Sequence, residues 1–299
     1  MDETALIGVD WGTTNARAFR YDAQGTVVET RHRGCGLLQI VDGDWETTFL
    51  KNFGDWTNGA PDLPVLLCGM VGSQQGWSEA PYVECPLDIS TLAENLHPIT
   101  GTDYCIVPGV RTIDGCGVPD VMRGEETQLA GLDPQGLQLV CLPGTHSKWV
   151  QIAGESVTGF QTYMTGELFK LLSEHSILAR TQTKGPSSHE AFLLGVDHSK
   201  RDGGLLHQLF GVRGLRLFDQ LTGDAQGDYL SGLLIGHEIR SALDATSAAG
   251  MVTVVGAKEL TSRYVTAMEY MGRSIIVTDG EQAASRGLWR IAQQAGMIA

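Results

Sequence analysis

The 299-residue chain lacks the sequence motifs of several large enzyme classes. It contains no G-x-x-x-x-G-K-[ST] segment, which excludes a P-loop nucleotide site as far as motifs decide it. It also contains no G-x-S-x-G, no H-E-x-x-H and no well-placed G-x-G-x-x-G. Its six cysteines form no C-x-x-C pair, and no histidine pair has zinc-finger spacing. We therefore expect free thiols in a reducing cytoplasm rather than disulfides or a zinc site.

Long apolar runs and positive charge are also scarce. No run of about 18 apolar residues occurs, and the N-terminal residues 1–4 include no basic region, so we expect neither a membrane span nor a signal peptide. The formal net charge of −14 argues against nucleic acid or an anionic membrane as a partner. The chain is 42% hydrophobic and 19% charged, and it is long enough for a sizeable core and two domains.

The first candidate site is a polar turn behind a short apolar strand at residues 5–9. The strand ends at Asp10, and residues 16–22 alternate as a second strand. The polar groups of this turn and its exit are Gly12, Thr13, Thr14, Asn15 and Arg17. A glycine lets backbone approach a ligand closely, and hydroxyl and N–H groups beside a carboxylate suit a phosphate with Mg²⁺. An ordinary β-hairpin with a polar tip explains the same residue types equally well.

A second polar loop, residues 69–77, follows a fully apolar stretch at residues 65–68, which predicts a buried strand. Ligands of open α/β sheets lie beyond the carboxyl ends of strands. The side chains of Ser73, Gln74, Gln75 and Trp77 would there suit a polyhydroxylated substrate, with amides on its hydroxyls and an indole under its carbons. The alternative interpretation is a structural turn with a surface tryptophan.

The segment 112–119 is rich in turn residues and lacks periodicity, so we place a domain boundary near residue 118. A plain surface loop is the alternative. The predicted domains are residues 1–118 and 119–299.

Residues 120–131 predict a helix capped by Asp120, with Glu125 and Glu126 near its start. Neighbouring helical residues point about 100° apart, so both carboxylates can hardly face one cleft centre. Acidic residues in a first helical turn can also simply complement the helix dipole.

The pattern of strand and polar turn occurs again. Residues 137–142 predict a strand, residues 143–148 a turn, and residues 149–153 another strand. The candidate phosphate ligands in this turn are Gly144, Thr145, His146, Ser147 and Lys148. Two such turns, each after a buried strand, indicate a duplicated fold with phosphates held between its halves. A further strand at residues 251–255 ends at Gly256-Ala257.

Asp-x-Gly-Thr-Thr-x-x-Arg at the end of a first strand resembles the first phosphate loop of the actin/hexokinase/sugar-kinase superfamily. The Gly-Thr-x-Ser turn resembles the second phosphate loop, and Gly256-Ala257 resembles the adenosine loop. The resemblance implies an α/β fold of two ribonuclease-H-like domains that close over ATP·Mg²⁺ and a polyol or sugar acid in the cleft between them. It implies that Asp10 holds Mg²⁺ through water.

In the sugar kinases a Gly-Asp-Gln-type segment opens a helix, and its aspartate takes the proton of the attacking hydroxyl. Counting from Gly124 assigns that role to Glu125. This chain departs from the pattern with a glutamate for the usual aspartate and with Glu126 next to it, so the choice between the two glutamates stays open.

Residues 69–86, with the pattern G-M-V-G-S…G-W…E-x-P-Y…C-P, resemble the 2-keto-3-deoxygalactonate kinases. This resemblance implies ATP-dependent phosphorylation of 2-keto-3-deoxy-D-galactonate to its 6-phosphate in galactonate breakdown. The expected partners are ATP, Mg²⁺ and a small sugar acid, with a homodimer as an option. One alternative is a kinase for another sugar acid or polyol, and another is an actin-like regulatory ATPase.

Overall fold

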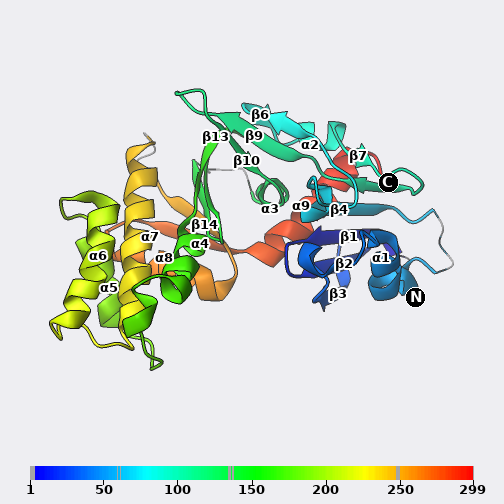
Figure 1. Ribbon diagram of the computed structural model, residues 1–299. Coiled ribbons are helices and arrows are strands. Elements are labelled where there is room, and N and C mark those ends of the chain that lie inside the picture. Colours follow the sequence, from blue (N-terminus) through cyan, green and yellow to red (C-terminus); the bar gives the residue numbers. More distant parts are fainter. Residues whose placement is uncertain are drawn as a thin grey trace. The chain divides into compact units, whose positions relative to one another are not determined.

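The computed structural model describes residues 4–58, 60, 62–133, 136, 138–246 and 250–298 (Figure 1). The chain forms two compact units. Unit 1 comprises Met1–Gly136, Ile152–Phe160 and Asp279–Ala299, and unit 2 comprises Leu137–Gln151 and Gln161–Thr278. The division into functional domains 1–118 and 119–299 stays a prediction, because compact units need not coincide with functional domains.

Unit 1 contains a six-stranded sheet with the strand order β3-β2-β1-β4-β8-β7. Its strands are β1 (Thr4–Trp11), β2 (Ala16–Asp22), β3 (Val27–Arg33), β4 (Val65–Gly69), β7 (His97–Pro98) and β8 (Tyr104–Ile106). β1 pairs antiparallel with β2 and parallel with β4. All of β4 is buried, which confirms the predicted strand at residues 65–68 and is typical of a strand covered on both faces.

Alternate residues of β1 point to opposite faces of this sheet. One face packs Val9 and Trp11 against aromatic residues of α1 (Trp45–Phe53), which is followed by the short helix η2 (Gly54–Trp56). The other face packs Gly8 against Leu288 of α9 (Gly280–Gln294). Asp10 shares this second face with Gly8.

Helix α9 also crosses α3 (Glu125–Ala130) at very short range. A Cβ on Gly287 would lie 1.8 Å from the carbonyl oxygen of Thr127, and a Cβ on Gly131 would lie 1.9 Å from that of Ala283. Only glycine permits this backbone approach. The crossing fixes α3 against the helix that covers the Asp10 face of the sheet.

A smaller sheet with the order β10-β9-β5 completes the strand framework of unit 1. The remaining elements of unit 1 are β5 (Tyr82–Glu84), β6 (Leu87–Asp88), β9 (Gly109–Ile113), β10 (Pro119–Met122), α2 (Thr91–Glu94), η1 (Leu37–Gln39) and η3 (Met70–Gly72). The predicted helix start at Asp120 is wrong, because this residue belongs to β10 and pairs with Thr112 of β9. The helix begins five residues later, at Glu125. A strand partner from β9 outweighs the local capping signal.

A second six-stranded sheet has the order β15-β14-β11-β12-β13-β6, and five of its strands repeat the order of the first sheet. By chain order, β15-β14-β11-β12-β13 corresponds to β8-β4-β1-β2-β3. The strands are β11 (Leu139–Leu142), β12 (Ser147–Ala153), β13 (Ser156–Tyr163), β14 (Val252–Gly256) and β15 (Ile275–Asp279). The predicted first residue of β11, Leu137, lies outside the described residues. In each of the two sheets, a polar turn follows the strand that comes first in the chain, which is β1 or β11, as the repeated pattern predicts.

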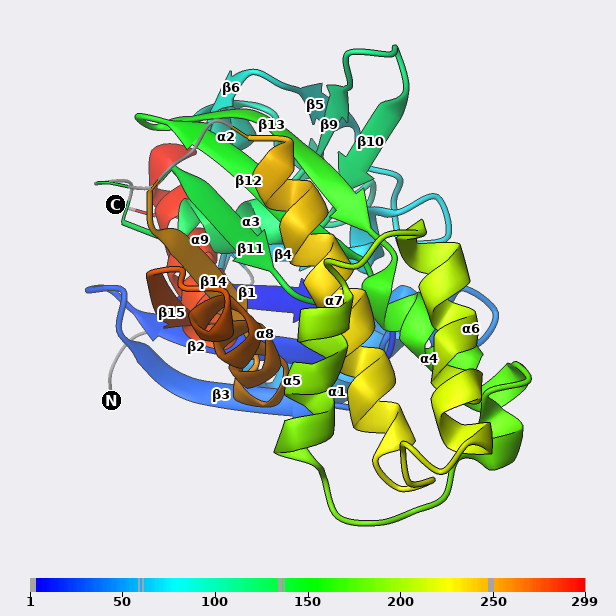
Figure 2. The same cartoon turned by 90° about the vertical axis from the view of Figure 1, so that its left-hand side faces the viewer.

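Helices cover the sheet of unit 2 and extend beyond it. They are α4 (Thr165–His175), η4 (Ala179–Thr181), α5 (His189–His198), α6 (Gly204–Leu217), α7 (Gln226–Asp244) and α8 (Lys258–Tyr270). Residues of α5, α7 and α8 pack with β11, β12 and β14 in one core (Figure 2). A second core joins α4, α5, α6 and α7. Among the helices described, none is long and apolar enough to span a membrane.

Candidate active site

The first polar turn is a tight hairpin between β1 and β2. The amide of Gly12 donates to the carbonyl oxygen of Asn15 at 2.9 Å. Asp10, which is 8% exposed, pairs across the strands with Arg17, and its carboxylate lies 2.5 Å from Nη2 of that guanidinium. A cavity of about 470 Å³ is lined by Asp10, Gly12, Thr13, Thr14, Asn15, Arg17 and His32. The structure thus brings together every residue predicted for this turn.

The segment after β3 supports the turn from behind. The amides of Gly36, Leu37 and Leu38 donate to the carbonyl oxygens of Thr14, Gly12 and Thr13 at 3.0–3.1 Å. A Cβ on Gly36 would lie 2.3 Å from the Thr14 carbonyl carbon, so only glycine allows this contact. The sequence analysis did not identify Gly36, because its partner backbone is more than 20 residues away.

A row of paired residues crosses the sheet at this point. Arg17 lies opposite Asp10 on one side and opposite His32 of β3 on the other. The parallel partner of Asp10 is Cys68, the residue before the end of β4. His32 was not predicted as a site residue, since its place beside the cavity depends on strand register. Its imidazole is exposed and lies 3.4 Å from the Glu281 carboxylate.

The start of α3 places its two glutamates differently. Glu126 is 1% exposed, and its carboxylate accepts from the Gly124 amide at 2.7 and 2.9 Å. Glu125 is half-buried, and its carboxylate accepts from the Arg123 amide at 3.0 Å. Gly124 itself has φ +107°, a conformation that favours glycine. Glu126 is therefore an interior residue, while Glu125 keeps contact with solvent.

The interior acid is held in its neutral form. Burial first, and then the neighbouring Glu125, raise the pKa of Glu126 to about 8. Burial also raises the pKa of the Cys68 thiol, and the Asp10 and Glu126 carboxylates raise it further. Both acids thus act on Cys68, on the Asp10 face of the sheet.

We expect Glu126→Gln to remove a pH-dependent loss of stability. The unfolded chain releases this proton near 4.5, whereas the folded protein retains it until about 8. The stability from this group is complete below the lower value and declines as the pH rises toward the upper one. Between about pH 5.5 and about pH 7.5 the wild type should lose about 3 kcal/mol more than the variant. Urea denaturation at both pH values measures this, with the exposed Glu79→Gln as a control that should follow the wild type.

The predicted substrate loop wraps tightly after β4. The side chains of Gln74 and Gln75 are exposed. The Ser73 hydroxyl donates back to the Met70 carbonyl oxygen at 2.8 Å, and the Trp77 ring packs 6.2 Å from the ring of Phe49. The two glutamines are therefore open to a ligand, whereas the serine and tryptophan also serve the loop itself.

Arg123 connects this loop region to the start of α3, and the sequence analysis did not identify it. Its Nη2 donates to the Ala80 carbonyl oxygen at 2.7 Å, and its guanidinium lies 4.3 Å from the centre of the Tyr82 ring. A Cβ on Gly72 would meet Nη1 at 2.8 Å. Arg123 thus holds the glycine-rich loop beside Glu125.

The second polar turn, in unit 2, exposes only its first part. Thr145 and His146 are exposed, and Gly144 is half-buried. Ser147 is 0% and Lys148 5% exposed, so both point into the protein. The turn is held by α4, whose Glu167 accepts a 2.5 Å hydrogen bond from His146 and donates its amide to Thr145.

The predicted adenosine residues end β14 and precede α8. Gly256 is half-buried and Ala257 exposed. A cavity of about 190 Å³ lies beside α8. Neither Gly256 nor Ala257 is among the described residues that line it. Its lining residues are Gly144, Thr165, Gly166, Phe169, Ser231, Leu234, Ile235, Leu260, Arg263 and Tyr264. The second polar turn and α8 therefore share one mostly apolar cavity.

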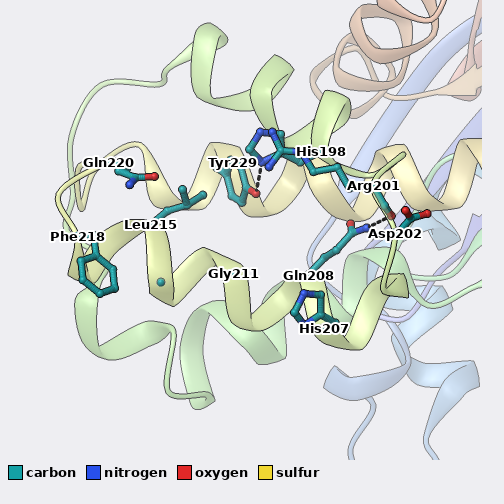
Figure 3. A pocket seen from close by; sticks show the side chains of 11 residues that line it. His198, Arg201, Asp202, His207, Gln208, Gly211, Leu215, Phe218, Gln220 and Tyr229 are labelled. Carbon is teal, nitrogen blue, oxygen red and sulfur yellow. Dashed lines mark hydrogen bonds between the residues drawn. The ribbon is translucent and has the colours of Figure 1, made fainter.

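A separate pocket of about 290 Å³ lies among α5, α6 and α7 (Figure 3). In this pocket the His198 imidazole and the Tyr229 hydroxyl form a 2.8 Å hydrogen bond, and Gln208 and Arg201 lie nearby. Its described lining contains none of the predicted site residues.

Comparisons with known proteins show which family the chain is similar to. A family model described as 2-keto-3-deoxy-galactonokinase matches residues 10–291. The 2-dehydro-3-deoxygalactonokinase of Escherichia coli (strain K12) is 35% identical over 289 residues, which cover 96% of this chain and 97% of that protein. A crystal structure from Sinorhizobium meliloti, named for 2-dehydro-3-deoxygalactonokinase, is 35% identical, covers 96% of this chain and 98% of its own, and has a TM-score of 0.89.

A more distant structure shares the fold alone. The (R)-2-hydroxyglutaryl-CoA dehydratase component A of Acidaminococcus fermentans is 12% identical, with a TM-score of 0.52 over 97% of this chain and 98% of its own. The predicted fold is confirmed: it is the mixed α/β fold of actin-like ATPases and sugar kinases.

Proposed function

The chain belongs to the 2-keto-3-deoxy-galactonokinase family, and we infer that it phosphorylates 2-keto-3-deoxy-D-galactonate with ATP. This is a carbohydrate kinase reaction with an alcohol group as acceptor. We further propose that the terminal hydroxyl is the acceptor, so that the product is the 6-phosphate. The observation that carries the site assignment is the cavity at Asp10, where a hairpin turn, a carboxylate and a guanidinium meet.

We propose that Glu125 accepts the proton of the attacking hydroxyl. Its carboxylate is half-buried, stands at the start of α3 and is connected through Arg123 to the loop with the exposed amides of Gln74 and Gln75. Phosphoryl transfer depends mainly on positioning and charge neutralisation, and a positioned base adds to that. Glu126 is a poorer candidate because its buried carboxylate is engaged with the Gly124 amide.

The residues around Asp10 fit a metal that is held largely by ATP. Within the described part of the chain, no three histidine, cysteine, aspartate or glutamate side chains form a metal-binding group. Mg²⁺ needs no such cage, since it commonly reaches protein through one or two carboxylates and keeps several waters. Asp10 already pairs with Arg17, which favours contact through water. Bound Mg²⁺ would neutralise phosphate charge, and titration of the reaction with MgCl₂ tests the requirement.

We propose that the adenine ring enters the apolar cavity at α8 and that the turn at Gly144 to His146 contacts the phosphates. Leu260 and Tyr264 line this cavity together with Gly144, so a bound nucleotide would contact both elements. Gly256 and Ala257 form the bend that directs α8. Ser147 and Lys148 lie on the buried side of this turn and support it from there.

A substrate panel tests the reaction. We expect 2-keto-3-deoxy-D-galactonate to give the highest kcat/KM among keto-deoxy acids, aldonates, glycerol and ketoses in a coupled assay of ADP release. Turnover of ATP should depend on the added sugar acid, which distinguishes a kinase from a regulatory ATPase. Best turnover with glycerol or xylulose, and none with the keto acid, would contradict the substrate assignment.

Two finer expectations stay proposals. A cytoplasmic location is supported by the six cysteines, which all lie among the described residues as free thiols, and cell fractionation would test it. A homodimer is the second expectation, and light scattering during gel filtration would test it.

A further inference from the structure

A chain of hydrogen bonds lies behind the second phosphate turn. The Ser147 hydroxyl of β12 is 2.9 Å from the Tyr264 hydroxyl of α8. Tyr264 donates to Oε2 of Glu238 at 2.7 Å. Trp149 Nε1 donates to Oε1 of the same carboxylate at 2.8 Å. One acid of α7 therefore connects the strand that leaves the turn with the helix that lines the apolar cavity.

The carboxylate of Glu238 has an unusual environment for an acid. It is 2% exposed, and it lies in the core between the sheet and the helices of unit 2. Burial raises its pKa, while hydrogen bonds from Thr165, Tyr264, Trp149 and Ser147 act in the opposite direction. A buried acid is costly unless donors satisfy both oxygens. Donors on α4, α8 and β12 provide this, and the Ser147 hydroxyl, whose one proton goes to the Tyr264 oxygen, reaches the carboxylate through Tyr264.

Several residues of this hydrogen-bond network also belong to the proposed ATP site. Thr165 and Tyr264 line the apolar cavity, and Ser147 directly follows the exposed residues of the turn. Gly166, next to Thr165, packs so closely that an added Cβ would lie 2.5 Å from the Gly144 carbonyl oxygen. A shift of the Tyr264 hydroxyl would therefore disturb the cavity wall and the turn together.

We propose that Tyr264 and Glu238 are positioning residues for ATP, which fix the second phosphate turn relative to the nucleoside cavity through Ser147. This inference rests on the proposed function, since it takes the turn and the cavity as the ATP site. Buried and fully satisfied polar networks hold one arrangement, and misplacement of binding groups lowers affinity and rate. The hydroxyl of Ser147 then serves the turn from inside and is not itself a phosphate ligand.

Tyr264→Phe tests the proposal because it keeps the ring in place and removes only the hydroxyl. We expect the KM for ATP to rise about tenfold or more, the loss typical of a missing hydrogen bond to a charged group. The KM for the sugar acid should stay unchanged. Tyr229→Phe is the matched control, since Tyr229 is a buried tyrosine of α7 whose hydroxyl bonds to His198 of α5 instead (Figure 3). The control should keep both KM values.

Ser147→Ala is a second test of the proposal, because it removes the bond to Tyr264 and leaves the bond between Tyr264 and Glu238 in place. We expect it also to raise the KM for ATP, and the double variant with Tyr264→Phe to be no worse than Tyr264→Phe alone, because both remove the same connection. Additive losses, equal effects of the two tyrosine variants, or parallel rises in both KM values would each overturn the proposal. Failure of the proposed function is distinct, because the wild type would then show no sugar-acid-dependent turnover and no binding of an ATP analogue by calorimetry.

Discussion

Glu125→Gln should lower kcat by about 10²–10⁴-fold, the usual contribution of a positioned general base. Glutamine keeps the size of the side chain and its ability to accept from the Arg123 amide, so the start of α3 should not move. It cannot take the proton of the sugar-acid hydroxyl. ATP binding should be largely preserved, because the polar groups of the first phosphate turn belong to a different element. Steady-state kinetics with both substrates, and calorimetry with an ATP analogue, measure the two effects separately.

Glu126→Gln is the internal control for this experiment. The neighbouring glutamate is already neutral below about pH 8, so its replacement by a neutral amide should change kcat little at neutral pH. If the Glu126 variant is inactive and the Glu125 variant mild, the role of base belongs to the interior residue and our assignment is off by one. If both variants retain the rate of the wild type, neither glutamate is the base and Asp10 becomes the candidate.

The sequence predicted what depends on short-range pattern. Both predicted phosphate turns follow buried strands, and the structure gives those strands equivalent positions in two sheets that share the order of five strands. The apolar run before Gly69 correctly predicted the buried strand β4. The Gly-Thr turns resemble the phosphate loops of the actin/hexokinase/sugar-kinase superfamily, and the comparisons confirm the fold that this resemblance implies.

The sequence did not predict what depends on strand pairing or on contacts between distant segments. Asp120 looked like a helix cap, yet β9 pairs with it as a strand. Arg123 and His32 were not identified as site residues, because their positions beside the loop and the cavity follow from register and packing. Ser147 has the residue type of a phosphate ligand, but its hydroxyl is directed to Tyr264. Each case involves a partner more than 30 residues away or on another strand.

Gly36 is such a long-range residue, and its replacement should have a large effect. In Gly36→Ala the new methyl group would lie 2.3 Å from the Thr14 carbonyl carbon and 2.6 Å from the Asn15 amide nitrogen. These are backbone atoms, so no side-chain rotation can relieve the overlap, and the turn must move. A displacement of about 1 Å in a positioned site can cost about 10²-fold in rate, so we expect kcat/KM for ATP to fall by at least about that factor. Steady-state kinetics at varied ATP concentration measure it.

Gly34→Ala is the matched control, two residues earlier in the same segment. A Cβ at this position meets nothing within 4 Å, so the control should keep the activity and the melting temperature of the wild type. The Trp11 indole holds this segment by donating to the Cys35 carbonyl oxygen at 2.6 Å, which lies between the two glycines and is unaffected by either change. Gly36→Ala should therefore remain folded while its turn is displaced, with the loss seen in ATP use and little change in unfolding temperature. Equal activity of the two variants would show that the segment behind the turn does not determine its geometry, and the phosphate-binding role of residues 12–15 would then have to rest on their side chains alone.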